Sequence, residues 1–429
     1  MQRNIYNQLL RWKNKKTRKP LILNGARQVG KTYILREFGQ NEYQKVVFFS
    51  LDRDQKVREV FEKSGSTADI LMALSAISQV DITPGDTLLV LDEIQDCPKA
   101  LEALKFFCEE TPDIHIVVAG SLLGLSLHDG TSYPVGKVEE MRLYPMTFLE
   151  FLNAMGKTQL VEIIENKKWA VVNMLQMELI GLLRQYYYVG GMPAAVLAHV
   201  EHNSLQEIRS IQLQILADYR RDFSKHAPAR EVPRINMVWD SIPPQLAKEN
   251  KKFIYGALKK SARAKDFEIA IQWLIDAGLA YKVVRVNAPR LPLKFYEDTD
   301  AFKLFMLDVG LMGAMAETPA ELMLVNDDVF SEYKGAFTEL YVFTQLKALG
   351  RSLYYHSVNN STIEIDFITQ SHNKVVPIEV KAEVNVKSKS LRTFITDNPG
   401  LKAIRFSMLP YMEQDWLTNI PLYACMAEI

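Results

Sequence analysis

The stretch Asn24–Thr32, NGARQVGKT, constrains the fold of this chain more than any other feature. It follows an apolar run at residues 20–23, typical of a buried strand, and precedes a helical pattern from Thr32 to Phe38. Gly25 and Gly30 allow the intervening backbone to turn its N–H groups inward at the helix N-terminus, where they can surround an anion. A strand, a glycine loop and a helix in this order predict phosphate binding. A surface turn with the same letters is the alternative.

The residues of this loop have separate predicted roles. Lys31 would reach the β- and γ-phosphates of a nucleotide, and the Thr32 hydroxyl would hold Mg²⁺. The other phosphate contacts would come from the rest of the loop, which consists of Gly25, Ala26, Arg27, Gln28, Val29 and Gly30. The motif therefore predicts that the chain binds ATP together with Mg²⁺.

A second motif, TLLVLDE at residues 87–93, supplies the acids that ATP hydrolysis requires. Its apolar run is typical of a strand buried on both faces, and ligands of open α/β sheets bind at the carboxyl ends of such strands. Asp92 would support Mg²⁺ through water, and Glu93 would be the general base that polarises the attacking water. Alone, the pattern also fits an ordinary strand followed by a polar turn. Together with the glycine loop it favours an ATPase.

Further apolar runs complete a predicted sheet. Residues 45–52 and 114–121 are typical of buried strands, and Glu102–Glu110 is typical of a helix between two of them. Ser121 ends its strand at the edge where ligands bind, so it is either a sensor beside the γ-phosphate or a simple strand-end serine. The alternation of strands and helices predicts a parallel α/β sheet with helices on both faces.

Composition adds few constraints to this prediction. A chain of 429 residues is too long for one ordinary hydrophobic core. Its 51 basic and 51 acidic residues balance, so no net charge draws the chain to nucleic acid or membrane. Cys97, Cys108 and Cys425 are too few and scattered for a disulfide framework or a structural zinc site. The basic N-terminus lacks an apolar signal core, and no run reaches membrane-spanning length, so we expect a cytoplasmic protein without membrane contact.

Five segments taken in order resemble one known family. They are LNGARQVGKT, LLVLDEIQ, VVAGSLLG, SYPVGKVEEMRLYPMTFLEFL and YYYVGGMPAAV. The set resembles the prokaryotic AAA-type ATPases with a C-terminal DUF4143 domain, over nearly the whole chain. This resemblance implies a P-loop ATPase with an additional strand in its sheet, in which Glu93 is catalytic.

The chain departs from the family pattern at Lys137, a position that is usually arginine in the family. If that cation contacts the γ-phosphate, lysine replaces a bidentate fork with a point charge. Arg142 and the pair Arg220 and Arg221 are further candidates for an arginine finger, although such a pair is more often a solvated face or a helix end.

Beyond the ATPase core, which we place at residues 1–165, the sequence predicts three more regions. A helical region at 166–230 contains the break GGMP at residues 190–193, a turn by its chemistry and alternatively a hinge. A winged-helix-like region follows at 231–290, and its basic segment at 251–265 is a candidate for DNA or RNA contact or a solvated face. The basic residues are Lys251, Lys252, Lys259, Lys260, Arg263 and Lys265.

The last predicted region, residues 291–429, carries a pattern of acids that resembles the PD-(D/E)xK nucleases. Glu339 lies on a helical segment, and Asp366 and Glu379 lie on successive strands, with Lys381 two residues after Glu379. Such carboxylates could bind a divalent ion beside a phosphate. The alternative is a domain that keeps this shape as a binding module, with acids that are merely solvated.

We therefore expect a cytoplasmic ATPase that repositions its C-terminal modules on a nucleic-acid or protein partner. An ATP-gated nuclease and an ATP-binding scaffold with little turnover remain alternatives. The sequence leaves a homo-oligomer, the biological partner and the pathway open.

Overall fold

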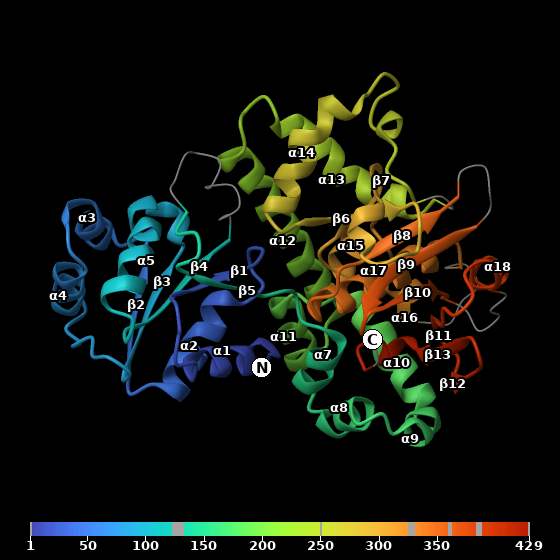
Figure 1. Ribbon diagram of the computed structural model, residues 1–429, viewed down its shortest axis with the longest axis horizontal. Coiled ribbons are helices and arrows are strands. Elements are labelled where there is room, and N and C mark those ends of the chain that lie inside the picture. Colours follow the sequence, from blue (N-terminus) through green and yellow to red (C-terminus); the bar gives the residue numbers. More distant parts are fainter. Residues whose placement is uncertain are drawn as a thin grey trace. The chain divides into compact units, whose positions relative to one another are not determined.

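The computed structural model describes residues 2–121, 133–248, 251–324, 331–358, 363–382 and 388–427 (Figure 1). Of the motifs quoted above, residues 122–124 and 132 lie outside these ranges. The chain divides into two compact units. The N-terminal unit contains residues 2–144 and 276–279, and the C-terminal unit contains residues 145–275 and 280–429.

The N-terminal unit contains a five-stranded parallel sheet in the order β2-β3-β4-β1-β5. β4 lies between β1, which leads into the glycine loop, and β3, which ends in the two acids. This arrangement confirms the predicted parallel α/β sheet and has the inserted strand that the family resemblance implies. The strands are β1 (Leu21–Asn24), β2 (Lys45–Ser50), β3 (Thr87–Asp92), β4 (His115–Gly120) and β5 (Glu139–Arg142).

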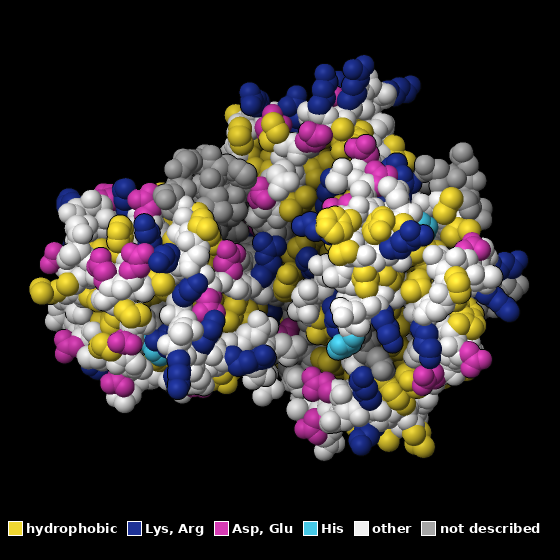
Figure 2. All heavy atoms as spheres, in the orientation of Figure 1, with side chains coloured by type: hydrophobic (Ala, Val, Ile, Leu, Met, Phe, Trp, Pro, Cys, Tyr) yellow, Lys and Arg dark blue, Asp and Glu magenta, His cyan; other side chains and the backbone are white. Residues whose placement is uncertain are grey.

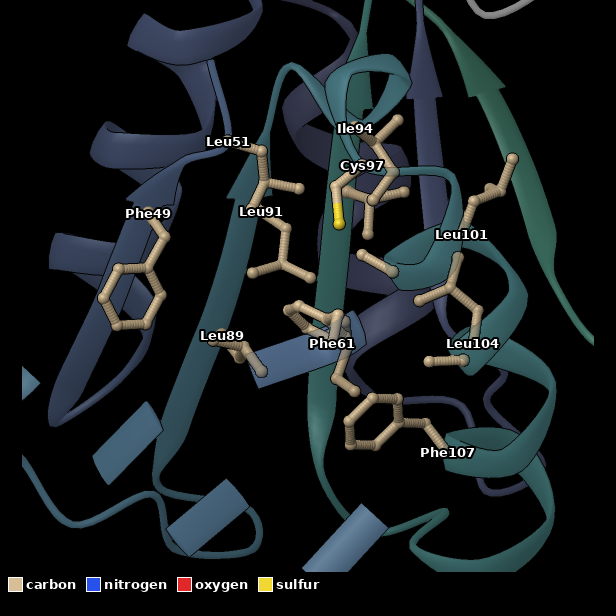
Figure 3. Close-up of a cluster of buried hydrophobic side chains, with 14 of the residues drawn as sticks. Phe49, Leu51, Phe61, Leu89, Leu91, Ile94, Cys97, Leu101, Leu104 and Phe107 are labelled. Atoms are coloured by element: carbon tan, nitrogen blue, oxygen red, sulfur yellow. The ribbon is translucent and has the colours of Figure 1, made fainter. Parts of the chain in front are cut away.

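Apolar strands explain the core of this unit. Every residue of β3 and β4 is buried, as expected for parallel strands covered on both faces. Phe61 and Phe107, from two of the helices, pack with Leu89 and Leu91 of β3 in one continuous cluster (Figure 3). The helices are α1 (Ile5–Lys13), α2 (Lys31–Glu42), α3 (Gln55–Lys63), α4 (Thr67–Ser78) and α5 (Pro98–Glu110).

The C-terminal unit contains an eight-stranded mixed sheet in the order β12-β13-β11-β10-β9-β8-β6-β7. β8, β9 and β10 are antiparallel neighbours, whereas β11 runs parallel to β10 and β13 parallel to β11. The β6–β7 hairpin joins this sheet through a parallel contact with β8. The strands are β6 (Ala280–Val286), β7 (Glu297–Met306), β8 (Tyr354–Ser357), β9 (Glu364–Ser371), β10 (Lys374–Val380), β11 (Ala403–Ser407), β12 (Met412–Glu413) and β13 (Leu417–Pro421).

The two faces of this sheet are covered by different helices, because successive residues of a strand point to opposite faces. Phe367 of β9 packs with Phe305 of β7 and Phe343 of α17. Its neighbour Ile368 instead packs in a cluster that includes Phe394 of α18. The sheet is therefore sandwiched between α17 (Ser331–Ala348) and α18 (Lys389–Asp397).

The remaining helices of the C-terminal unit lie mostly before the sheet in sequence. They are α7 (Phe148–Ala154), α8 (Thr158–Glu165), α9 (Trp169–Met174), α10 (Gln176–Val189), α11 (Pro193–Glu201), α12 (Leu205–His226), α13 (Val232–Leu246), α14 (Ala264–Asp276), α15 (Val309–Met315) and α16 (Ala320–Leu324). Among the residues that the structure describes, no helix combines the length and apolar character needed to cross a bilayer.

Two expected domain boundaries differ from this architecture. The N-terminal unit ends at Tyr144 rather than at residue 165, because residues 145–165 pack with the C-terminal unit. The boundary placed at residue 290 falls inside the β6–β7 hairpin, whose strands share one sheet with the C-terminal strands. The region predicted to be winged-helix-like contains α13, α14 and β6, and these elements belong to the larger C-terminal unit. A winged helix remains a prediction for this region.

The GGMP break is a tightly packed turn. Gly191 N donates a 2.6 Å hydrogen bond to Asp308 Oδ2, and Met146 N donates one of 2.6 Å to Gly191 O. A Cβ atom on Gly191 would collide with the backbone oxygen of Met146, and one on Gly190 would collide with the Asp308 carboxylate. Burial raises the pKa of Asp308 to about 6, against the opposing effect of the backbone N–H donors. These contacts favour a rigid turn over a hinge.

Candidate nucleotide site

The glycine loop has the backbone shape that its sequence predicts. α2 begins at Lys31, directly after Gly30, which adopts a left-handed conformation with φ of 95°. Gly25 has φ of 154°, and a Cβ atom there would lie 2.5 Å from Leu143 O. Both glycines are therefore required by geometry, one for its conformation and one for a close backbone approach.

The Lys31 ammonium is held inside its own loop. Its Nζ atom donates to Gly25 O and to Ala26 O, each at 2.8 Å. Burial lowers the pKa of Lys31 to about 8, although the charges of Glu93 and Asp92 act in the opposite direction. An anionic phosphate in the loop would replace the carbonyl partners and favour the charged lysine.

Thr32 and Asp92 meet at the start of α2 and the end of β3. Thr32 Oγ1 donates a 2.6 Å hydrogen bond to Asp92 Oδ2. Burial raises the pKa of Asp92, and the hydrogen bond from Thr32 partly offsets this effect. A hydroxyl beside one carboxylate supplies oxygen ligands of the kind that Mg²⁺ prefers, to be completed by water and phosphate oxygens. The residues therefore fit the predicted metal.

Glu93 is the first residue after β3, in a left-handed conformation with φ of 53°. Its Oε2 atom accepts a 2.6 Å hydrogen bond from Gln95 Nε2 and one of 3.2 Å from Ser121 Oγ. Ser121 directly follows β4, so the inserted strand brings its hydroxyl to the catalytic candidate. The structure thus brings together the residues predicted from three separate sequence motifs.

Sequence reasoning missed two supporting residues. Arg3 is buried and donates to Val29 O of the glycine loop at 3.0 Å and to Tyr144 O at 2.6 Å. Gln95 lies only two residues after Glu93 and donates to its carboxylate. A polar residue close to a predicted base is a usable signal. Arg3 has no such signal in the sequence, because its two partners lie 26 and 141 positions further along the chain.

The candidate arginine-finger residues lie in different places. Lys137 precedes β5, at the amino end of the sheet, and forms a 2.8 Å ion pair with Glu109 of α5. Arg142 ends β5 in register with Asn24, the last residue before the glycine loop, and its side chain is exposed. Because phosphates bind at the carboxyl ends of parallel strands, Arg142 is on the relevant edge and Lys137 is not.

The other two finger candidates are engaged within the C-terminal unit. Arg220 forms a 2.5 Å ion pair with Asp240, and Arg221 pairs with Asp218 on its own helix. Both arginine side chains remain substantially exposed. These surface pairs are weak and leave each arginine free to exchange partners.

Two lysines occupy the centre of the predicted nuclease-like site. Lys303 of β7 is fully buried and lies 2.9 Å from Glu339 Oε1 and 2.7 Å from Glu364 Oε1. Lys251 also forms an ion pair with Glu339. Burial raises the pKa of Glu339, but the two lysines outweigh it and hold the pKa below its ordinary value.

The strand acids of this site lie beside the lysine cluster. Phe367 of β9 and Ile378 of β10 form the last antiparallel pair between these strands. The next residues along the two strands, Asp366 and Glu379, therefore lie opposite one another. Burial and then Glu339 raise the pKa of Asp366 to about 6. Glu379 pairs with Lys381 at 3.3 Å.

Ser388 donates a hydrogen bond to the same Glu379 carboxylate. Across the described ranges, no three His, Cys, Asp or Glu side chains are placed to hold a metal ion together. Metal binding by Glu339, Asp366 and Glu379, with Lys381 beside a phosphate, stays a prediction.

Part of the basic segment at 251–265 is engaged in contacts within the protein. Lys251 forms an ion pair with Glu339, so an acid from elsewhere in the chain balances part of this segment. The exposed members are Lys259, Lys260, Arg263 and Lys265. Figure 2 shows Lys and Arg side chains gathered at the top of the view, over the segment that leads into α14. A smaller basic patch therefore remains on the surface.

Comparison with known families matches three stretches of the chain. Residues 17–152 match an AAA domain, residues 180–322 match a domain of unknown function (DUF8612), and residues 334–424 match a domain of unknown function (DUF4143). No protein of curated function matches the chain. The AAA match covers the sheet, the glycine loop and the acids described above.

Several solved structures match this chain at low sequence identity and low TM-score. The Walker-type ATPase PABY2304 of Pyrococcus abyssi is 12% identical, with a TM-score of 0.45, and the match covers 73% of this chain and 95% of that one. The Aeropyrum pernix Orc1 protein in complex with DNA is 14% identical, with a TM-score of 0.28, over 75% and 92%. The Thermotoga maritima RuvB branch migration motor is 16% identical, with a TM-score of 0.27, over 68% and 90%.

Likeness at this level carries no information on ligands or partners. The ordered family matches and the parallel sheet with its glycine loop confirm the resemblance seen in the sequence. The chain therefore combines an AAA domain with a C-terminal DUF4143 domain, in the order that the resemblance implies.

Proposed function

We propose that the protein binds ATP with Mg²⁺ and hydrolyses it, with Glu93 as the general base. The observation that carries this proposal is the convergence of Lys31, Thr32 and Asp92 with Glu93 and Ser121 at one edge of the sheet. A glycine loop alone supports binding. A carboxylate held at the end of β3, on the same edge of the sheet, supports hydrolysis as well.

Each side chain has a defined task in this proposal. The loop N–H groups and Lys31 bind the β- and γ-phosphates, while Thr32 and Asp92 hold the metal directly and through water. Bound Mg²⁺ supplies charge neutralisation on the phosphate oxygens. Glu93 accepts a proton from the attacking water, and Ser121 and Gln95 keep its carboxylate oriented.

We further propose that turnover repositions the C-terminal modules on a nucleic-acid or protein partner. The exposed basic residues Lys259, Lys260, Arg263 and Lys265 support phosphate contact with DNA or RNA. Association of copies of the chain, with Arg142 or Arg220 acting on a neighbour's nucleotide, is compatible with their exposure.

The test is ATP turnover of the full chain, alone and with DNA or RNA. Glu93→Gln should bind ATP normally and lose at least about 100-fold in kcat, because the amide keeps the shape and lacks the base. Arg53→Ala is a matched surface control, since its side chain is largely exposed. Normal turnover in Glu93→Gln would move catalysis to another residue. No turnover in the wild type would favour the scaffold alternative.

The nuclease alternative has less support, because lysines already balance the acids of its site. Asp366→Ala separates the two functions. Under the proposal this variant keeps ATPase activity, and any metal-dependent cleavage of DNA or RNA by the wild type that Asp366→Ala abolishes would establish the nuclease instead.

A further inference from the structure

The hydroxyl of Ser121 lies between the glycine loop and the catalytic candidate. Arg27 Nε is 3.3 Å from Ser121 Oγ, which in turn is 3.2 Å from Glu93 Oε2. A guanidinium has only donors and an ionised carboxylate has only acceptors. The hydroxyl must therefore accept a hydrogen bond from Arg27 and donate one to Glu93, so its proton points toward the Glu93 carboxylate.

Both donors to Glu93 use the same oxygen. Ser121 Oγ and Gln95 Nε2 donate to Oε2, at 3.2 Å and 2.6 Å. Within the part of the chain that is described, no hydrogen bond is assigned to Oε1, and that oxygen is left to take a proton from water. Fixing one oxygen of a carboxylate orients the other.

Arg27 belongs to the loop that would hold the phosphates, and its positive charge acts on another residue of that loop. It opposes the protonation of Lys31, whose ammonium lies inside the same loop. Ser121 is buried, so its hydroxyl has little access to competing water. A short chain of side chains therefore joins the phosphate loop to the base through the tip of β4.

We propose that Arg27 is a positioning residue that orients Glu93 through Ser121. This inference rests on the proposed ATPase function. Arg27 acts on the rate of hydrolysis through the Ser121 side chain, in addition to any contact that the loop makes with phosphate. Arg27 and Ser121 should then behave as one unit, and removing either should remove the same effect.

The experiment compares Arg27→Gln, Ser121→Ala and the double variant in the full chain. We expect each single variant to lower kcat by about tenfold or more and to change the Kd of a non-hydrolysable ATP analogue by about threefold or less. The double variant should be no slower than the slower single variant. Ser121→Thr, which keeps a hydroxyl, should restore most of the rate, and Arg53→Ala should match the wild type.

The split between kcat and ATP affinity gives a readout that a merely structural role would not move. Damage to the loop would weaken ATP binding together with the rate, whereas a misoriented Glu93 lowers kcat and leaves the Kd nearly unchanged. Ser121→Ala should show this split, and Ser121→Thr should recover the rate. Melting curves identify any variant that fails to fold, and in that case the Ser121 pair alone decides.

Two results would overturn the inference while leaving the proposed function intact. Additive losses in the double variant would show that Arg27 and Ser121 act independently. A weakened Kd with unchanged kcat in Arg27→Gln would make Arg27 a phosphate ligand only. The proposed function fails separately, if the wild type shows no turnover or Glu93→Gln turns over normally.

Discussion

Thr32 Oγ1 lies 2.6 Å from Asp92 Oδ2, although the two residues are 60 positions apart. The contact joins the first turn of α2 to the end of β3 without any direct pairing between β1 and β3. It places a hydroxyl and a carboxylate where one cation can use both.

Thr32→Val should remove the effect of Mg²⁺ on ATP affinity, because the methyl that replaces the hydroxyl cannot bind a metal. We expect a loss of at least about tenfold in affinity with Mg²⁺ present and little change without it. Titration of a fluorescent ATP analogue with and without Mg²⁺ measures both values. Thr32→Ser is the control and should behave as the wild type. A valine variant that still responds fully to Mg²⁺ would remove Thr32 from the metal site.

ATP affinity should fall as the pH rises above about 8, which is the pKa of Lys31 in the free protein. Below that pH the ammonium is charged and attracts phosphate, and above it a proton must be taken up on binding. Lys31→Ala should not bind at any pH. Affinity that stays constant between about pH 7 and 9.5 would contradict the assignment.

The same lysine has a consequence for stability, with the opposite sign. The unfolded chain keeps this proton up to the ordinary lysine pKa of 10.5, whereas the folded protein releases it near 8. The free energy of unfolding without nucleotide should therefore rise, as far as Lys31 is concerned, between these pH values. Lys31→Met, compared with the wild type by denaturant unfolding across this range, isolates the contribution.

Lys137→Ala should leave ATP turnover unchanged, while Arg142→Ala should lower it. Lys137 pairs with Glu109 at the amino end of the sheet, and Arg142 ends β5 beside the glycine loop. Steady-state turnover of both variants, and of Lys137→Arg, provides the comparison at several protein concentrations. A rate loss in Lys137→Ala alone would show that the family position acts on the nucleotide of another copy.

Asp366→Asn should stabilise the protein at neutral pH by up to about 3 kcal/mol. Burial and the charge of Glu339 raise the pKa of Asp366 to about 6, so its ionised form is disfavoured in the fold. Between about 4 and 6 the folded state keeps a proton that the unfolded state releases, and stability should fall as the pH rises. Asparagine should flatten this dependence and still accept from Val380 N.

Melting with and without Mn²⁺ tests the nuclease-like prediction on the same protein. If the two lysines fill the site, as their ion pairs with Glu339 favour, Mn²⁺ should not shift the melting temperature. A Mn²⁺-dependent rise that Asp366→Asn removes would restore the metal site.

Gly191→Ala should destabilise the C-terminal unit by about 3 kcal/mol or more, because the added Cβ meets the Met146 carbonyl within the backbone. Gly181→Ala is the matched control, since a Cβ there meets nothing within 4 Å and the residue lies inside α10. The control should be neutral or stabilising. Urea unfolding of both variants measures the difference. A tolerated Gly191→Ala would revive the interpretation of this turn as a hinge.

The nucleotide site was predictable because its determinants are local. The strand, the glycine loop and the start of α2 occupy one short stretch. Residues 88–91 of β3, LLVL, are all apolar, as expected for a strand covered on both faces. Ser121 was predictable to the extent that an apolar strand ends there. The sequence marks its partner Arg27 only as one residue of the loop, since no sequence pattern indicates which neighbour a long side chain will reach.

The C-terminal unit shows what sequence patterns leave out. Lys303 sits in the apolar run AFKLFM, where a lysine suggests an edge facing water, yet its side chain is fully buried. The explanation is Glu339, which lies 36 positions further along. Burial lowers the pKa of Lys303, but Glu339, Glu364 and Asp366 outweigh it and raise the pKa above its ordinary value. Such compensation depends on tertiary contacts alone.

The buried pair of Lys303 and Glu339 also limits how this protein can exchange parts with others during evolution. The lysine comes from the β6–β7 hairpin and the glutamate from α17, within the stretch that matches DUF4143. A recombination event that transferred residues 334–424 alone would leave one charge of this pair buried without its counterpart. The hairpin and the DUF4143 stretch should therefore be inherited together, as one cassette that begins well before the family boundary.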